Sequence, residues 1–132
     1  MIIGIGCDII SVQRIQTAME RNERFADKLF TPAEIAYCQS KASPWQSYAA
    51  RFAAKEAVMK ALGTGWDGKV NWLDIEVRSD DKGNPYIKLS GGARKLADEK
   101  GICNIQLSLS HEKENALAFV IMENSLQASN SG

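Results

Sequence analysis

A long helix that ends at a glycine constrains this chain more than any other feature of its sequence. The stretch from Pro44 to Leu62 is rich in alanine and holds no glycine or further proline, as a stable helix requires. Pro44 suits the first helical position, and Ser43 and Gln46 around it fit a capping box. Gly63 is a natural stop, because glycine readily adopts the left-handed conformation that ends many helices. We therefore expect one long helix, against which the rest of the domain packs.

One face of this helix carries an unusual set of groups. Glu56 and Lys60 are four residues apart and Gly63 lies three further on, so all three fall on one ridge. Small alanines flank this ridge and let other groups approach it. An ordinary Glu–Lys ion pair beside a glycine cap accounts for the pattern, at about 0.3–0.5 kcal/mol. One edge of a metal–phosphate site also accounts for it, and the helix alone does not decide between the two.

Hydrophobic periodicity and turn residues divide the rest of the chain into short elements. The order β-α-α-α-β-β-α-β-β is dominated by hairpins, which favours an α+β fold with a mainly antiparallel sheet packed against the long helix. We expect strands over residues 2–10, 73–78, 86–89, 105–110 and 116–123, and shorter helices after Ser11, after the Thr31–Glu34 capping box and over residues 93–100.

Charge and cysteine content exclude several classes of protein. The 132 residues suit one domain, which we expect over residues 1–123, with a flexible tail over residues 124–132. Lys plus Arg equals Asp plus Glu at 16 each, and this neutral balance argues against a general nucleic-acid binder. The three cysteines form no C-x-x-C pair, so we expect neither a zinc site nor a disulfide framework, and a reducing cytoplasm fits. The N-terminus lacks the features of a signal peptide, and no apolar run is long enough to span a membrane.

The first strand carries a second candidate group for a metal site. Alternation along the strand places Gly4, Gly6 and Asp8 on one face, where the glycines leave room for a ligand beside the carboxylate. The Gly-x-Gly pair is not a dinucleotide-binding fingerprint, because Ile9 occupies the third glycine position. Magnesium is commonly held by one or two carboxylates together with waters and phosphate oxygens. Asp8 and Glu56 are therefore the candidate ligands.

Two further polar features leave their alternatives open. His111, the only histidine, follows Ser110 at the end of a strand; a lone histidine is more often packed or solvated than functional, yet polar groups gather there. Arg14, Arg21 and Arg24 could dock an acidic partner, although nearby acidic residues nearly cancel their charge and a solvated mixed-charge face fits as well.

Taken together, these segments resemble the phosphopantetheinyl transferases, specifically their short holo-acyl-carrier-protein synthase type. The likeness runs from Ile3 to about Glu123. Each motif is modest alone, but all of them in this order and at these spacings are highly specific. They are GIGCDI over residues 4–9 with Arg14 following, FTPAE over 30–34, RFAAKEA over 51–57 with KALGTG over 60–65, DIEV over 74–77 and LSLSHE over 107–112.

The resemblance implies transfer of the 4′-phosphopantetheine arm of coenzyme A to a serine of an apo acyl carrier protein, with adenosine 3′,5′-bisphosphate as the by-product. It implies that Asp8 and Glu56 bind Mg²⁺ and that Lys60 contacts the same phosphates. Gly63 and Gly65 would let the backbone approach the coenzyme, with His111 beside it. Glu56 would also take the proton of the attacking serine, directly or through a bound water.

The same resemblance gives the arginines a partner. Acyl carrier proteins are small and acidic, so Arg14, Arg21 and Arg24 would pair with carboxylates around the target serine. Members of the short type look like homotrimers with the coenzyme site between subunits. The resemblance therefore implies that the Asp8–Glu56 pair and His111 come from different subunits. Fatty acid biosynthesis in the cytoplasm is the expected setting. Neither nucleic acid nor membrane is an expected partner.

Two other functions share some of these residues. A non-catalytic adaptor that binds coenzyme A would keep the basic helix but lack a working metal site. A metal-dependent pyrophosphate hydrolase would keep the carboxylate pair but need no arginine docking face. Coenzyme breakdown without any carrier protein would favour the hydrolase.

Overall fold

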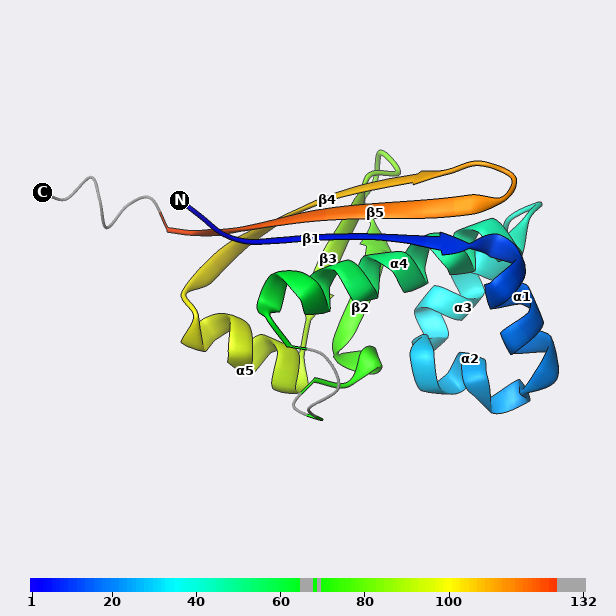
Figure 1. Ribbon diagram of the computed structural model, residues 1–132, viewed down its shortest axis with the longest axis horizontal. Helices are drawn as coiled ribbons and strands as arrows, with labels where there is room; N and C mark the ends of the chain where they lie inside the picture. The colour runs from blue at the N-terminus through cyan, green and yellow to red at the C-terminus, as the bar shows by residue number, and fades with distance from the viewer. Residues whose placement is uncertain (65–67, 69, 126–132) are drawn as a thin grey trace, which may run out of the picture.

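The computed structural model describes residues 1–64, 68 and 70–125, and it confirms the predicted α+β fold (Figure 1). One strand, a run of helices, and two pairs of antiparallel strands separated by a helix follow one another along the chain, as the sequence predicts apart from one extra helix and a 3₁₀ turn. The elements are β1 (Ile2–Ser11), α1 (Val12–Arg21), α2 (Glu23–Leu29), α3 (Pro32–Gln39), α4 (Pro44–Leu62), the 3₁₀ helix η1 (Trp72–Asp74), β2 (Ile75–Ser79), β3 (Pro85–Leu89), α5 (Gly91–Glu99), β4 (Ile102–His111) and β5 (Asn115–Asn124).

A three-stranded antiparallel sheet covers the long helix. Its strand order is β1-β5-β4, so the N-terminal strand and β4 form the two edges of the sheet. Along one row of the sheet, Asp8 lies opposite Ala118, which in turn lies opposite Leu109. Strands β2 and β3 form a separate antiparallel pair. Figure 1 shows the larger sheet as one layer above α4, with α1, α2 and α3 grouped at one end and α5 at the other.

Helix α4 forms the centre of the core. Twelve of its 19 residues are buried, and between Tyr48 and Leu62 the residues that are not buried, Phe52, Glu56 and Lys60, lie on one ridge. Its alanines Ala53, Ala54 and Ala57 are fully buried and keep the helix narrow. Because small side chains let backbones approach closely, the sheet and the flanking helices reach α4 from several directions.

The glycines of β1 serve this close approach. A Cβ atom at Gly6 would lie 1.8 Å from the carbonyl oxygen of Ala57, and one at Gly4 would lie 2.4 Å from that of Ala61. Our expectation that these glycines leave room for a ligand is therefore wrong. The backbone of α4 fills that space, and the glycines instead bring β1 against the helix.

Three local predictions also need correction. The helix expected after Ser11 is two helices, because Asn22 has an extended backbone and caps both the end of α1 and the start of α2. The strand expected from Leu73 begins at Ile75, since Leu73 belongs to η1. Ser43 precedes α4 as predicted, but its side chain makes no capping hydrogen bond.

Some predictions fall on residues that the structure does not describe. Gly65 and the tail from residue 126 onward lie outside the described residues. Among the helices that the structure does describe, none is long and apolar enough to cross a membrane.

Candidate active site

Three charged side chains predicted to act together meet where β1 lies along α4. Lys60 donates a hydrogen bond from Nζ to Oδ1 of Asp8 at 3.1 Å and another to the backbone oxygen of Cys7 at 3.0 Å. The Asp8 side chain is 18% exposed and that of Lys60 is 52% exposed, so the group lies at the surface. Lys60 thus pairs with Asp8, across the β1–α4 contact, rather than with Glu56 one turn away.

Glu56 lies in the same electrostatic environment. Its pKa is raised above the ordinary value by burial and by the nearby Asp8 carboxylate, while the Lys60 ammonium opposes the shift. A divalent cation between the two side chains would offset the unfavourable effect of the Asp8 carboxylate on the ionisation of Glu56.

The donor set fits a hard cation such as Mg²⁺, which prefers oxygen ligands. Among the described residues, no group of three or more histidine, cysteine or acidic side chains could hold a metal ion. A cation at Asp8 and Glu56 would therefore take its other ligands from water or from a substrate, as Mg²⁺ commonly does at phosphate sites. The residues present fit that role.

Gly63 ends α4 as the sequence predicts. It has φ +74°, and its N–H bonds the carbonyl of Lys60 while the N–H of Thr64 bonds that of Met59, a Schellman motif. Lys100 donates from Nζ to the carbonyl oxygen of Leu62 at 2.5 Å. The last turn of the helix is thus closed by backbone and side-chain donors, and the exposed backbone of Gly63 lies beside it.

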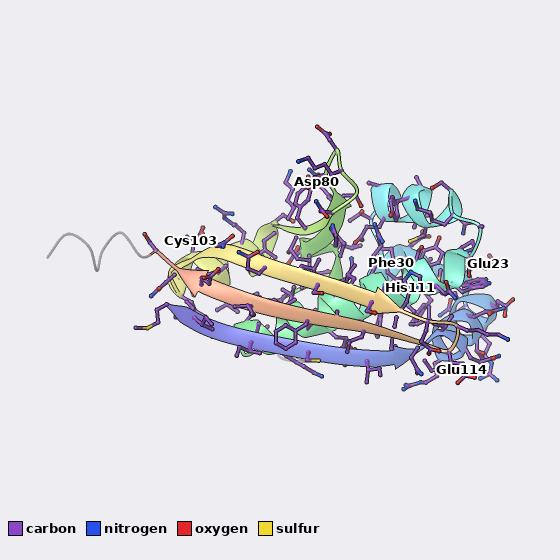
Figure 2. All side chains as sticks on the ribbon, turned by 90° about the horizontal axis from the view of Figure 1, so that it is seen from above. Glu23, Phe30, Asp80, Cys103, His111 and Glu114 are labelled. Carbon is purple, nitrogen blue, oxygen red and sulfur yellow. The ribbon has the colours of Figure 1, made fainter. Side chains whose placement is uncertain are left out.

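His111 does not join this group within one chain. Asp8 lies on β1 and His111 is the last residue of β4, at the opposite edge of the sheet. Two strand spacings separate these edges, which is about 10 Å, and α4 lies beneath the sheet between them. Figure 2 looks onto the outer face of the sheet and shows His111 near the end of β4, beside the turn that carries Glu114.

His111 instead lines a cavity of about 200 Å³ together with Arg51, Tyr37 and Ser79. Arg51 is only 4% exposed, and its guanidinium carbon lies 3.8 Å from the centre of the Tyr37 ring. Its Nε atom is buried and has no hydrogen-bond partner among the described residues. A buried cation with an unused donor, beside hydroxyls and an imidazole, suits an anionic ligand.

Sequence reasoning did not assign Arg51 a role. Arg51 lies outside the ridge of Glu56 and Lys60, in an alanine-rich run that does not show from the sequence whether a charged side chain is buried or exposed. The one available signal was a second cation close to Lys55 in an alanine-rich run.

Lys55 itself belongs to a buried ion pair that supports the site. Its Nζ lies 2.7 Å from Oε1 of Glu34, and both side chains are 0% exposed. Lys55 also donates to the carbonyl oxygen of Leu29, while Glu34 accepts from the backbone N–H of Val77 and closes the predicted capping box with Thr31. Burial lowers the pKa of Lys55, and the Glu34 carboxylate opposes that change. The pair fixes the start of α3 and the strand β2 to α4, one residue before Glu56.

The three arginines predicted to dock a partner lie close in sequence but on two helices. Arg14 and Arg21 are exposed on α1, seven residues apart and so on the same side of it. Arg24 is exposed in the first turn of α2, past the corner at Asn22. No carboxylate of the described residues forms an ion pair with any of the three. Their charges are available to a partner.

Comparison with known proteins identifies the relatives of this chain. Residues 4–120 match the 4′-phosphopantetheinyl transferase superfamily. The chain is 49% identical over 124 residues to the holo-[acyl-carrier-protein] synthase of Halothermothrix orenii, covering 93% of this chain and 98% of that protein. It is 46% identical over 123 residues to the synthase of Clostridium acetobutylicum, with 93% and 98% covered.

Solved structures of such synthases share the fold. The Neisseria meningitidis enzyme superposes with a TM-score of 0.86 at 38% identity, over 94% of this chain and 100% of that one. The Helicobacter pylori enzyme, solved in complex with coenzyme A, gives a TM-score of 0.80 at 34% identity, over 90% and 99% of the two chains. The Bacillus anthracis enzyme, in complex with coenzyme A (3′,5′-ADP), gives 0.78 at 38% identity, over 95% and 99%.

Proposed function

This chain belongs to the 4′-phosphopantetheinyl transferase superfamily, and from that membership we propose that it transfers the 4′-phosphopantetheine arm of coenzyme A to a serine of an apo acyl carrier protein. The serine oxygen attacks the phosphorus that bears the arm. The bond from that phosphorus to the nucleotide breaks, and adenosine 3′,5′-bisphosphate leaves. The grouping of Asp8, Glu56 and Lys60 at the β1–α4 contact is the observation that carries this proposal.

Asp8 and Glu56 are the proposed Mg²⁺ ligands. A bound Mg²⁺ would polarise the attacked phosphate as a Lewis acid and stabilise the charge of the leaving bisphosphate. Lys60 uses two of its three N–H donors on Asp8 and Cys7 within the described residues, so one remains for a phosphate oxygen. The backbone of Gly63 would lie against the coenzyme. Most of the acceleration would come from positioning and charge stabilisation, as in other phosphoryl transfers.

Glu56 is also the proposed base for the serine proton. A carboxylate whose pKa is raised by burial and by a neighbouring carboxylate accepts a proton more readily than an exposed one. The proton of the attacking serine hydroxyl would pass to a Glu56 oxygen, directly or through a water molecule.

Arg14, Arg21 and Arg24 are proposed to dock the carrier protein. Their side chains are exposed and have no ion-pair partner within the described residues, and acidic carrier helices would supply carboxylates. Contact with the carrier would then weaken as salt rises.

A homotrimer with its active sites between subunits is proposed as the working assembly. The outer face of the sheet exposes apolar side chains that are paired across β1 and β5, with Ile5 at 57%, Ile9 at 65% and Phe119 at 40% exposure. Such a contiguous patch is typical of a protein interface. Contact between the β1 edge of one subunit and the β4 edge of the next would bring His111 to the Asp8–Glu56 pair, which a single chain does not do.

We propose that the cavity lined by Arg51 and His111 binds the 3′-phosphate of coenzyme A, the phosphate that lies outside the pyrophosphate. The buried Nε atom of Arg51, which has no partner among the described residues, supports a phosphate there.

A cytoplasmic setting is consistent with three free thiols, and fatty acid biosynthesis is the proposed pathway.

The proposal is tested by incubating the protein with coenzyme A, Mg²⁺ and an apo acyl carrier protein and weighing the carrier by intact-mass spectrometry. The carrier should gain the mass of one phosphopantetheine arm, and a chelator should prevent the gain. Retained coenzyme binding without transfer would indicate an adaptor. Release of adenosine 3′,5′-bisphosphate without carrier would indicate a hydrolase.

A further inference from the structure

A second lysine reaches the end of α4 from a different part of the chain. Lys100 is the C-cap of α5, and its backbone N–H is bonded to the carbonyl of Leu96. From there its side chain extends to α4 and donates from Nζ to the Leu62 carbonyl oxygen at 2.5 Å. The ammonium is thus held at the C-terminus of α4 by two elements that are distant in sequence.

The charge at this point matters because a helix C-terminus carries roughly half a negative charge. That sign repels a phosphate approaching Gly63. Lys60 lies in the same last turn, but its ammonium is directed to Asp8 and Cys7 on β1. Lys100 therefore supplies a cation at the helix end that Lys60 does not supply.

The ammonium also lies against the exposed backbone of Gly63. A Cβ atom built on Gly63 would be 3.3 Å from Nζ of Lys100, so a group that takes that space would contact the lysine. Within the described residues, no carboxylate lies within ion-pair distance of Lys100, and one of its three N–H donors is used on Leu62. The remaining donors can reach an anion at Gly63.

We infer that Lys100 is a further binding residue of the coenzyme site, which offsets the charge of the α4 C-terminus and contacts the pyrophosphate of coenzyme A. This inference rests on the proposed function, which brings the coenzyme to Gly63. The alternative is a purely structural role, in which Lys100 only caps the Leu62 carbonyl.

The two roles are separated by Lys100→Gln, because glutamine keeps an N–H donor for Leu62 but has no charge. We expect the dissociation constant of coenzyme A, measured by calorimetry without carrier, to rise about five- to tenfold, as loss of one charged contact predicts. The KM for coenzyme A should rise by a similar factor, with kcat and the KM for carrier changed less than about twofold. Lys100→Arg should retain most of the affinity, and the difference from wild type should shrink in high salt.

Lys95→Gln is the matched control, since it removes an exposed lysine of the same helix α5. If Lys100→Gln binds coenzyme A as tightly as Lys95→Gln does, Lys100 is only a cap and the inference is wrong. If Lys100→Gln does not fold, Lys100→Met replaces it in the same calorimetry: weaker binding of coenzyme A supports the inference, and binding as tight as that of the wild type overturns it. A loss of affinity in Lys100→Arg equal to that in Lys100→Met would also overturn a role for charge. Failure of the wild type to bind coenzyme A at all would instead overturn the proposed function.

Discussion

Glu56 occupies a position that disfavours its own charge. Its pKa is raised in the folded chain, so the folded state binds the proton more tightly than the unfolded state does. The stability from this proton is present below the unfolded-state pKa and is lost as pH rises through the raised value. At neutral pH the ionised carboxylate therefore costs stability, and a cation bound beside it would offset that cost.

Glu56→Gln should accordingly separate stability from activity. We expect the free energy of unfolding at pH 8 to rise by a few tenths to about 1 kcal/mol, with a smaller gain at pH 4. Transfer should fall about 100-fold or more because a metal ligand and base is lost. Urea unfolding at both pH values and the transfer rate check this. Glu20→Gln, at an exposed glutamate of α1, is the control; a Glu56→Gln variant less stable than it at pH 8 would contradict the account.

The buried pair of Lys55 and Glu34 predicts a large effect on folding. Lys55→Met leaves the Glu34 carboxylate without its cation at 0% exposure, which should cost about 3–5 kcal/mol of stability. The double variant Lys55→Met/Glu34→Gln should lose less stability than the two single variants together, because each single variant leaves one buried polar group without its partner. Urea unfolding of the three variants tests this. Additive losses would mean that the pair is not coupled.

Residues differ in how far the sequence reveals them. Asp8 and Glu56 could be paired as candidates because each is an acidic residue next to small neighbours, and the family motifs contain both. Lys55 and Arg51 could not be assigned, since their partners Glu34 and Tyr37 lie on α3, and only tertiary packing brings them within contact.

At the scale of elements, the contact between β1 and α4 determines how close Asp8 lies to Glu56 and Lys60. Gly6→Ala would place a Cβ atom 1.8 Å from the Ala57 carbonyl oxygen, so the strand and helix would have to separate. We expect a loss of about 1–3 kcal/mol or more from this overpacking, and a larger loss of transfer because Asp8 moves away from Glu56. Gly101→Ala is the control, since it adds only the strain of φ +74° with open space around it. Full transfer activity in folded Gly6→Ala would show that this spacing is not critical.

The corner between α1 and α2 carries the docking prediction. Arg14→Ala should raise the KM for carrier protein about five- to tenfold and leave that for coenzyme A unchanged, with the defect fading as salt rises. Arg94→Ala, at an exposed arginine on α5, should change neither constant. Steady-state kinetics with each substrate varied in turn decides the matter. Equal changes in both KM values for Arg14→Ala would argue against docking at α1.

Elements were predictable where one local signal dominated. The Thr31–Glu34 capping box and the Gly63 stop are both present because each depends on a few adjacent residues. The break at Asn22 was missed because charged residues continue through it without glycine or proline. The start of β2 was misplaced because the alternation from Leu73 onward resembles a strand, whereas Asn71 caps a 3₁₀ turn there.

At the scale of the whole molecule, the sheet of a single chain is incomplete in two respects. Its outer face exposes the paired apolar rows of β1 and β5. Its two edges also carry the two halves of the proposed site, with Asp8 on β1 and His111 on β4. The sequence could not show this division, because it depends on which strand lies between them. The proposed second subunit would cover the apolar rows and bring the two halves of the site together.

The most direct test of this account mixes two inactive variants, Asp8→Ala and His111→Glu, and measures transfer after subunit exchange. Each variant alone should be inactive, since one loses a metal ligand and the other places an acid beside the anionic coenzyme. If a site takes Asp8 from one subunit and His111 from the next, random mixing in a closed ring should leave about a quarter of the sites intact and restore about that share of wild-type activity. Native mass spectrometry would verify that mixed oligomers form. Mixed oligomers with no more activity than the separate variants would contradict the central claim that a second subunit completes the transferase site.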